Sequence, residues 1–310
     1  MSPINLAIVG VGKIVRDQHL PSIAKNADFK LVATASRHGT VEGINSYTTI
    51  EAMLDAEPSI DAVSLCMPPQ YRYEAAYKAL VAGKHVFLEK PPGATLSEVA
   101  DLEALAAKQG ASLFASWHSR YAPAVEAAKA FLASTTIKCV HVIWKEDVRH
   151  WHPNQEWIWQ AGGLGVFDPG INALSILTHI IPGRLHVAAA ELAFPANCEA
   201  PIRANLWLAH ESQAEITVEF DFSTPGSPSW DIDIGTDAGR LTLSRGGADL
   251  RIGDELLFPA ENNEYRNLYR RFAELIQHRR MDVDLAPFTL VADAFLVGRR
   301  VEAPPFVEHK

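Results

Sequence analysis

The sequence of 310 residues contains few cysteines and no long hydrophobic segment. Its three cysteines, Cys66, Cys139 and Cys198, lie far apart and form no CxxC pair, which excludes a zinc knuckle and a dithiol redox motif. We expect them to be buried free thiols that pack as small hydrophobic residues. No run of 18 apolar residues occurs, so we expect no segment to cross a membrane. The start of the chain also lacks the features of a secretion signal, which favours a cytoplasmic location.

Positive charge is scarce as well. Lys and Arg number 28 against 37 Asp and Glu, which gives a net charge of −9. Nucleic acids and anionic membranes are bound by clustered positive charge, so we expect neither as a partner. A hydrophobic fraction of 48% with 21% charged residues is typical of a folded globular protein, and the length fits about two domains.

Between residues 4 and 115, short apolar runs alternate with amphipathic stretches. The pattern predicts strands over 4–9, 29–35, 62–65, 85–88 and 112–115, and helices over 71–82 and 96–108. The S/T-x-x-E signal that begins a helix occurs twice, at Thr48 and at Thr95. Strands that are apolar on both faces and alternate with helices are typical of a parallel sheet covered by helices. We therefore predict an α/β domain with a Rossmann-type parallel sheet over residues 1–120.

After residue 120 the pattern changes to strand-like runs separated by turn signals at hairpin distances. The runs predict strands over 137–144, 187–194, 204–208, 214–222, 230–234, 240–244 and 250–252. Helical patterns at 171–181, 265–279 and 287–299 are expected to cover one face of the resulting sheet. We therefore predict a second, α+β domain over residues 121–310, with a large, mostly antiparallel open sheet.

A glycine-rich turn follows the first predicted strand. A dinucleotide-binding turn needs one glycine for the tight turn, a second where the main chain approaches a pyrophosphate, and a third for close helix packing. The first two glycines are present, but Val15 replaces the third. Because the turn lies between a strand and a helix, we predict a dinucleotide site, and an ordinary glycine turn is the alternative. The residues predicted to form it are Gly10, Gly12, Lys13 and Ile14.

The residues after the second predicted strand indicate which dinucleotide is bound. An NAD-selective site usually places Asp or Glu there, to bind the ribose 2′-hydroxyl. This sequence has Ser36-Arg37-His38 instead. A hydroxyl and a guanidinium can bind a 2′-phosphate, whereas a carboxylate would repel it. We therefore expect NADP to be favoured over NAD, although nothing in the sequence rejects NAD and an ordinary polar loop is the alternative.

Two residues are candidates for catalysis. Lys90 follows Glu89 at the end of a predicted strand, and ligands of open parallel sheets bind beyond the carboxyl ends of the strands. Its amine can bind a substrate hydroxyl and stabilise a developing alkoxide, and the alternative is a surface lysine. Asp168 and Asn172 lie four residues apart at a predicted helix start, which places a carboxylate and an amide on one face. The alternative for Asp168 is a helix cap.

Tryptophans interleaved with polar residues between positions 145 and 159 suit a sugar. Indole rings pack against the apolar C–H face of a sugar, while carboxylates, imidazoles and amides bind its hydroxyls. His150 and His152 lack a matching carboxylate–His motif, so we expect no metal. The residues predicted to hold the substrate are His118, Glu146, Trp151, His152, Asn172 and Trp230.

Three of these motifs together resemble the Gfo/Idh/MocA oxidoreductase family, named for glucose–fructose oxidoreductase and inositol dehydrogenase. They are Gly10-x-Gly12, the tripeptide Glu89-Lys90-Pro91, and the run Gly162-Gly163 with Asp168-x-Gly170. The resemblance covers nearly the whole chain. It implies that Lys90 is catalytic, that the second sheet lines the substrate cleft, and that the protein is a homo-oligomer, a dimer or a tetramer.

Further stretches are similar to bacterial aldose 1-dehydrogenases of this family that act on D-galactose and L-arabinose. They are residues 12–19, 89–96, 117–119 and 144–148. The resemblance implies NAD(P)-dependent oxidation of a small neutral sugar, D-galactose, L-arabinose or D-fucose, at the anomeric carbon to the lactone. We also expect Pro68, Pro69, Glu89 and Trp159 to contact the cofactor.

One residue departs from the family pattern. Many members have Asp-x-Gly-x-His, in which the His is the proposed acid/base, whereas this chain has Asn172 at that position. Asn cannot accept a proton at neutral pH, so Lys90 and Asp168 remain as candidate proton acceptors, and the sequence does not distinguish them. The same departure agrees with the galactose and arabinose subgroup.

Two other functions belong to the same family. One is a non-catalytic regulator that senses a sugar or a dinucleotide, and the other is a sugar enzyme that uses bound NAD without net oxidation. Retention of both Lys90 and Asp168 speaks against a sensor, which needs no proton acceptor. The preferred aldose, its ring form and the number of subunits are not predicted by the sequence.

Overall fold

The computed structural model describes residues 2–257 and 263–308, and it divides the chain into two compact units. The first unit comprises Met1–His118 and Glu264–Asp284, and the second comprises Ser119–Asn263 and Leu285–Lys310. The structure thus adds a segment from the C-terminal part to the first unit, whereas the sequence analysis assigned everything after residue 120 to the second domain. Within the described ranges, no helix is both long enough and apolar enough to cross a membrane.

The first unit is built on a parallel six-stranded sheet in the order β3-β2-β1-β4-β5-β6. Its strands are β1 (Ile4–Val9), β2 (Phe29–Ala35), β3 (Asn45–Tyr47), β4 (Ala62–Leu65), β5 (His85–Glu89) and β6 (Leu113–Ser116). The strand order reverses beside β1, where the chain crosses from β2 and β3 to β4. In such sheets the ligand site lies beyond the carboxyl ends of the strands at this reversal.

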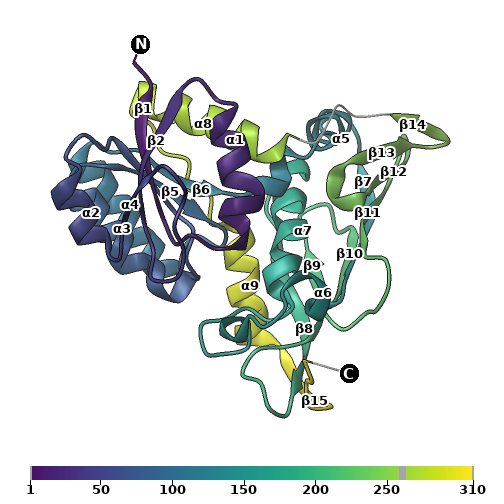
Figure 1. Ribbon diagram of the computed structural model, residues 1–310. Coiled ribbons are helices and arrows are strands. Elements are labelled where there is room, and N and C mark those ends of the chain that lie inside the picture. Colours follow the sequence, from purple (N-terminus) through teal and green to yellow (C-terminus); the bar gives the residue numbers. More distant parts are fainter. Residues whose placement is uncertain (1, 258–262, 309–310) are drawn as a thin grey trace. The chain divides into compact units, whose positions relative to one another are not determined.

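Helices cover both faces of this sheet (Figure 1). On one face lie α2 (Ile50–Ala56), α3 (Arg72–Val81) and α4 (Leu96–Gln109), and on the other lie α1 (Leu20–Ala24) and α8 (Glu264–His278). Short helical turns precede two of them, η1 (Val15–His19) before α1 and η2 (Pro69–Tyr71) before α3. Thr95 and Glu98 form the complete capping box predicted for α4. The predicted start at Thr48 was wrong by one residue, because the Thr49 side chain caps α2.

Helix α8 corrects one expectation of the sequence analysis. The pattern at 265–279 was expected to cover the second sheet, but α8 packs against α1 and β6 of the first unit. Its Tyr269 ring stacks on Phe87 with centroids 5.3 Å apart, and Phe272 stacks on Phe29 at 5.9 Å. Helical periodicity identifies an apolar face but not the sheet that this face contacts.

The second unit is built on a nine-stranded sheet in the order β14-β13-β12-β11-β7-β10-β9-β8-β15. Its strands are β7 (Ile137–Lys145), β8 (His186–Pro195), β9 (Arg203–Ala209), β10 (Glu215–Asp221), β11 (Ser229–Thr236), β12 (Gly239–Ser244), β13 (Asp249–Ile252), β14 (Glu255–Leu257) and β15 (Arg299–Ala303). Neighbours are antiparallel except β7 with β10 and β8 with β15. The predicted fold class, a Rossmann-type domain with a mostly antiparallel α+β domain, is confirmed.

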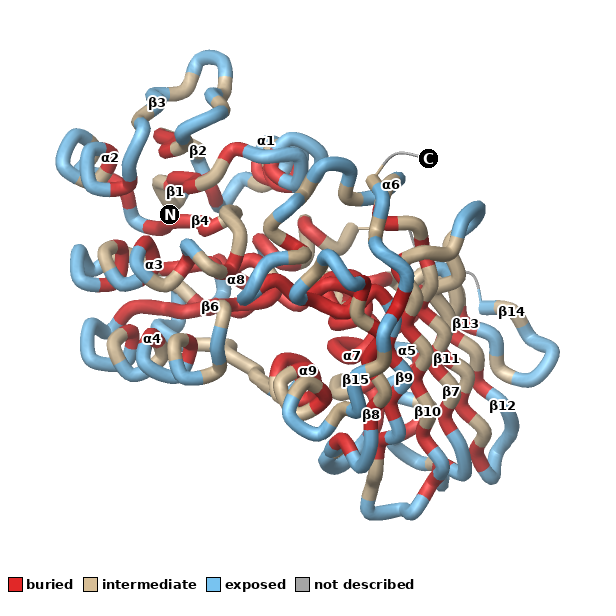
Figure 2. Tube along the Cα trace, turned by 90° about the horizontal axis from the view of Figure 1, so that it is seen from below, coloured by how far each residue is buried: buried red, intermediate tan, exposed pale blue. Residues whose placement is uncertain are grey.

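Helices α5 (Val125–Leu132), α7 (Phe167–Ile180) and α9 (Ala286–Val297) pack on one face of the nine-stranded sheet (Figure 1). Buried and more exposed residues alternate along its strands, as Figure 2 shows for β10 and β12. In β9, for example, Leu206 is buried under the helices while Trp207 is 46% exposed on the opposite face. A period of two residues is what a sheet covered on one face requires. The short helices α6 (Val148–Trp151) and η4 (Glu156–Ile158) follow β7.

The cysteines are free, but the expectation that all of them are buried was wrong. Cys139 is exposed, and Cys66 and Cys198 are half-buried. Cys139 lies within β7 on the face of the sheet that the helices leave uncovered, so its alternation in the strand, not its residue type, decides its exposure.

Candidate functional site

The glycine turn lies at the carboxyl end of β1. Gly10 has φ = 89°, and a Cβ built on it would lie 2.8 Å from the main-chain nitrogen of Met67, so both conformation and packing require glycine. A Cβ on Gly12 would meet no atom within 4 Å, so the main chain there is open to a ligand. Val15, in place of the third glycine, is fully buried at the start of η1. The turn therefore fits the close approach of a pyrophosphate.

Polar groups follow the ends of the neighbouring strands. Ser36 follows β2 and its hydroxyl accepts the His38 N–H at 3.4 Å, while Arg37 and His38 are exposed. Beyond β4, Pro68 precedes the turn η2 as its N-cap residue, and Pro69, the first residue of η2, is buried. These segments and the glycine turn stand at the carboxyl ends of three adjacent strands, β2, β1 and β4. The residues predicted to bind the cofactor in the first unit thus suit a dinucleotide. The exposed guanidinium of Arg37 is available to bind a phosphate.

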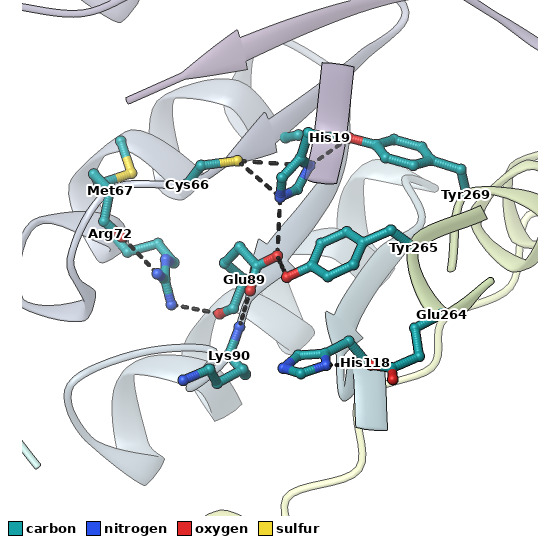
Figure 3. Close-up of polar contacts among 11 residues, drawn as sticks. His19, Cys66, Met67, Arg72, Glu89, Lys90, His118, Glu264, Tyr265 and Tyr269 are labelled. Atoms are coloured by element: carbon teal, nitrogen blue, oxygen red, sulfur yellow. Dashed lines mark hydrogen bonds and ion pairs between the residues drawn. The ribbon is translucent and has the colours of Figure 1, made fainter. Parts of the chain in front are cut away.

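Lys90 directly follows β5 and is half-buried (Figure 3). Glu89 is 4% exposed, and its side chain accepts the Lys90 main-chain N–H at Oε2 at 3.0 Å. Its Oε1 accepts hydrogen bonds from the Tyr265 hydroxyl and His19 Nε2, both at 3.0 Å. Both carboxylate oxygens are therefore held by groups of the protein itself, and contact of Glu89 with the cofactor stays a prediction.

Glu89 and His19 form a buried ion pair. Burial alone would raise the pKa of the Glu89 carboxyl, but the hydrogen bond and charge of His19, together with the charges of His118 and Arg72, lower this pKa to about 2. Burial lowers the pKa of His19, yet its contacts with Cys66, Tyr269 and Glu89 raise that pKa well above its usual value. His19 Nδ1 lies 2.7 Å from the Tyr269 hydroxyl, so both ring nitrogens have partners.

Sequence reasoning missed four residues around Lys90, namely His19, Arg72, Tyr265 and Tyr269. The Arg72 guanidinium is 2% exposed and donates to main-chain carbonyls on both sides of Lys90, those of Glu89 and Pro91. A buried arginine carries no sequence signal of its own. His19 and Tyr269 are 250 positions apart, so no local pattern could have joined them.

His118 ends the first part of the first unit, just after β6. Its Nδ1 lies 2.7 Å from Glu264 Oε2, and its ring stacks on Tyr265 with centroids 5.5 Å apart. The first residues of α8 therefore orient this imidazole, which was predicted to bind substrate.

In the second unit, the predicted sugar-binding residues gather at the end of β7 and the start of β11. Glu146 is 3% exposed, and its Oε2 accepts the indole N–H of Trp230 at 2.7 Å. The Trp230 ring lies 6.0 Å from that of Trp144 and 5.2 Å from that of Trp151, which is 38% exposed. A carboxylate among indole rings is a suitable surface for a sugar.

Asp168 lies in the first turn of α7 and is 2% exposed. Its Oδ2 is 3.7 Å from Nε2 of His152, the residue that follows α6. Asn172 follows one turn later on α7 and is half-buried. The alternative that Asp168 caps the helix is wrong, because Val166 occupies the N-cap position and no side chain caps it. The structure thus joins a carboxylate, an imidazole and an amide near one helix end.

Trp159 was predicted to contact the cofactor and lies in the second unit. Its ring packs against Phe306 at 4.7 Å and Phe222 at 6.1 Å between centroids. This packing accounts for its position, and its contact with a cofactor stays a prediction.

The predicted residues are thus divided between the two units. In the first unit they are Gly10, Gly12, Lys13, Ile14, Ser36, Arg37, His38, Pro68, Pro69, Glu89, Lys90 and His118, and in the second they are Glu146, Trp151, His152, Trp159, Asp168, Asn172 and Trp230. No group of three or more metal-ligating side chains occurs in the part of the chain that the structure describes.

Comparisons with known proteins identify relatives of the whole chain. The model of the Gfo/Idh/MocA oxidoreductase family, described as an NAD-binding Rossmann fold, matches residues 4–116. Galactose 1-dehydrogenase of Pseudomonas fluorescens is 44% identical over 308 residues, which cover 99% of this chain and 100% of that protein.

Among solved structures, a D-galactose-1-dehydrogenase is also similar over nearly the whole chain. The crystal structure of D-galactose-1-dehydrogenase from Rhizobium etli is 74% identical, with a TM-score of 0.96 and 99% of each chain covered. The 3-ketoreductase KijD10 from Actinomadura kijaniata, solved with NADP and TDP-benzene, covers 97% of this chain and 100% of its own, with a TM-score of 0.83. At 19% identity, that likeness shows the fold alone.

Proposed function

This chain belongs to the Gfo/Idh/MocA oxidoreductase family and is a homologue of galactose 1-dehydrogenases, and we propose that it oxidises D-galactose at the anomeric carbon to the lactone. L-Arabinose and D-fucose, which share the hydroxyl arrangement around the ring, are proposed as further substrates. The observation that carries this proposal is the similarity to two galactose 1-dehydrogenases over 99% of the chain. The buried Glu146 carboxylate on the indole of Trp230 supports it, because this pairing suits a neutral sugar.

The reaction removes one proton and one hydride from the sugar. When bound, the nicotinamide dinucleotide supplies the acceptor for the hydride from the anomeric carbon. Lys90 and Asp168 are assigned to the proton of the anomeric hydroxyl, and either of them is able to accept it. Asn172 cannot accept a proton, so its amide is assigned to orienting that hydroxyl.

The remaining polar and aromatic residues are assigned to the sugar ring. Glu146 accepts hydrogen bonds from hydroxyls, while Trp151 and Trp230 pack against the apolar face of the ring. His118, held by Glu264, and His152, beside Asp168, are assigned to further hydroxyls.

The dinucleotide is proposed to be NADP in preference to NAD. The support is the exposed Arg37, with Ser36 beside it, at the end of β2, where no carboxylate stands to repel a 2′-phosphate. Contacts of Lys13, Ile14, His38, Pro68, Pro69, Glu89 and Trp159 with the cofactor belong to the same proposal.

We propose further that the protein is a cytoplasmic homo-oligomer, a dimer or a tetramer, without nucleic-acid or membrane partners. The face of the nine-stranded sheet that the helices leave uncovered is the surface assigned to this contact. Light scattering of the eluted protein during size-exclusion chromatography tests it, and a monomer at micromolar concentration would overturn it.

Steady-state assays of the purified protein test the proposed reaction. Galactose, fucose, arabinose and glucose are each incubated with NAD or NADP, and formation of reduced cofactor is followed by absorbance. We expect turnover with galactose and a lower KM for NADP than for NAD. Binding of a dinucleotide without net reduction by any of these sugars would instead indicate a sensor or a redox-neutral enzyme.

A further inference from the structure

The main chain around Lys90 is held by two buried charged side chains, Arg72 and Glu89, neither of which is assigned to the sugar or to the proton transfer. Arg72 of α3 donates to the carbonyl of Glu89, and the Glu89 side chain accepts the Lys90 N–H (Figure 3). Arg72 also donates to the carbonyl of Pro91, the residue after Lys90. We propose that Arg72 and Glu89 are positioning residues that keep the Lys90 main chain in one place, so that its amine meets the reacting hydroxyl in a single orientation. This inference rests on the proposed role of Lys90 in catalysis.

The Arg72 guanidinium binds three main-chain carbonyls. Its Nη1 donates to the carbonyl of Glu89 at 2.5 Å and to that of Pro91, and its Nη2 donates to the carbonyl of Met67 at 2.5 Å. Arginine is rarely buried, because taking its charge out of water is unfavourable unless hydrogen bonds compensate for the loss. The planar guanidinium can reach several carbonyls in a fixed geometry, which a lysine amine cannot do. Met67 lies in the loop after β4, Glu89 is the last residue of β5 and Pro91 lies in the loop after it, so Arg72 connects the ends of these two strands.

The Glu89 carboxylate binds the main chain of Lys90. Glu89 belongs to β5, so the sheet fixes its main chain, and its carboxylate bonds the next residue's N–H at 3.0 Å. That carboxylate is fixed in turn by His19 and Tyr265, each at 3.0 Å from Oε1. Lys90 is therefore held at its own N–H and at the carbonyls on either side. Misplacing a catalytic group by about 1 Å can lower a rate by about 100-fold.

A purely structural role is the competing explanation, since the same network helps to dock α8 on the sheet. A structural role predicts loss of stability together with changes in both kcat and KM. A positioning role predicts a loss confined to kcat, because binding of the sugar and of the dinucleotide does not require the exact place of the Lys90 amine.

The test uses the full chain with the variants Arg72→Met, Arg72→Lys and Glu89→Gln. Tyr73→Phe is the matched control, because Tyr73 is the next residue of α3 and its hydroxyl bonds only Asp101 among the contacts described, at 2.6 Å. We measure kcat and KM for galactose, the Kd of the reduced dinucleotide by fluorescence, and amide hydrogen exchange of the peptide 85–95 by mass spectrometry.

We expect Arg72→Met to lower kcat by about 100-fold, with KM and Kd changed less than about threefold. Glu89→Gln should lower kcat by about 10-fold, with KM for galactose changed less than about threefold. The Kd of the dinucleotide is compared only for the Arg72 variants, because Glu89 is also assigned to the cofactor. Arg72→Lys should recover only part of the loss. Exchange in the peptide 85–95 should become faster in these variants and stay unchanged in Tyr73→Phe. If Arg72→Met does not fold, kcat and hydrogen exchange of Glu89→Gln test the positioning role, because this variant keeps the shape of the side chain and a carbonyl acceptor.

Two results would overturn the inference. One is an unchanged kcat in folded variants, and the other is unchanged exchange in the peptide 85–95. If the wild-type protein oxidises no aldose, the proposed function fails, and the exchange data alone then decide whether Arg72 and Glu89 hold Lys90.

Discussion

Trp230 Nε1 donates a hydrogen bond of 2.7 Å to Oε2 of Glu146, and these residues lie on β11 and directly after β7. The two strands pair so that Trp230 stands opposite Trp144. The bond fixes one oxygen of a buried carboxylate, and the indole rings of Trp144 and Trp151 flank the donor. Strand register thus assembles a carboxylate and an aromatic surface from residues 84 positions apart.

Removal of the Trp230 indole should weaken sugar binding. Trp230→Phe keeps a ring but deletes the donor to Glu146, which leaves a buried carboxylate short of one hydrogen bond. We expect KM for galactose to rise about 10-fold, with little change in KM for the dinucleotide. The matched control is Trp207→Phe on the same sheet, since Trp207 is 46% exposed on the uncovered face. Equal effects of the two variants on KM would contradict the assignment.

Lys90 and Asp168 should act as one catalytic unit. We expect Lys90→Ala to lower kcat by about 1,000-fold and Asp168→Asn by about 100-fold, since general acid–base groups contribute about 10² to 10⁴. Residues that act together are not additive, so the double variant should be no slower than the worse single variant. Single-turnover rates of reduced-cofactor formation measure this. A double loss equal to the product of the single losses would show independent roles.

Arg37 should set the preference for the phosphorylated dinucleotide. Arg37→Ala removes a charge-assisted contact worth about 1.5–3 kcal/mol, so KM for NADP should rise about 10- to 100-fold while KM for NAD changes little. Lys30→Ala, which removes one exposed positive charge elsewhere on β2, is the control. If KM rises equally for NADP and NAD, Arg37 does not bind the 2′-phosphate.

The buried pair of Glu89 and His19 should make stability depend on acid pH. The pKa of the Glu89 carboxyl falls from 4.5 to about 2 on folding, so this group stabilises the protein above pH 4.5 and loses its effect as the pH falls towards 2. The contribution is on the order of 3 kcal/mol. Urea unfolding followed by circular dichroism should therefore show wild type more stable than Glu89→Gln at pH 6, with the difference shrinking below pH 4.5. A pH-independent difference would mean that Glu89 is not ionised in the folded protein.

Much of the local structure was predictable. The strands over 4–9, 29–35 and 62–65 match β1, β2 and β4 in both bounds, because continuous apolar runs between turn signals leave little choice of element. The capping box at Thr95 likewise begins α4 as predicted. Short polar strands carry no such signal, and β3 at Asn45–Tyr47 was missed for that reason.

The site was predictable only where its residues have a local signature. Gly10, Gly12 and Lys90 stand at strand ends that the hydrophobic pattern reveals, and the tryptophans near 151 indicate the surface that is proposed to bind a sugar. His19, Arg72 and Tyr265 have no such signature, because their roles come from partners 70, 17 and 176 positions away. The pairing of His152 with Asp168 was also unforeseen, since it depends on the turn that follows α6.

The sequence by itself therefore determined the two sheets, most of their strands and the polar residues that follow the strands. These depend on hydrophobic periodicity and turn chemistry, which act over a few residues. Only the tertiary structure decided that α8 returns to the first sheet, and that Glu89 is held by a histidine and a tyrosine from distant segments. Long-range contacts follow from which apolar faces pack together, and a buried charge gains its partners only once that packing is complete.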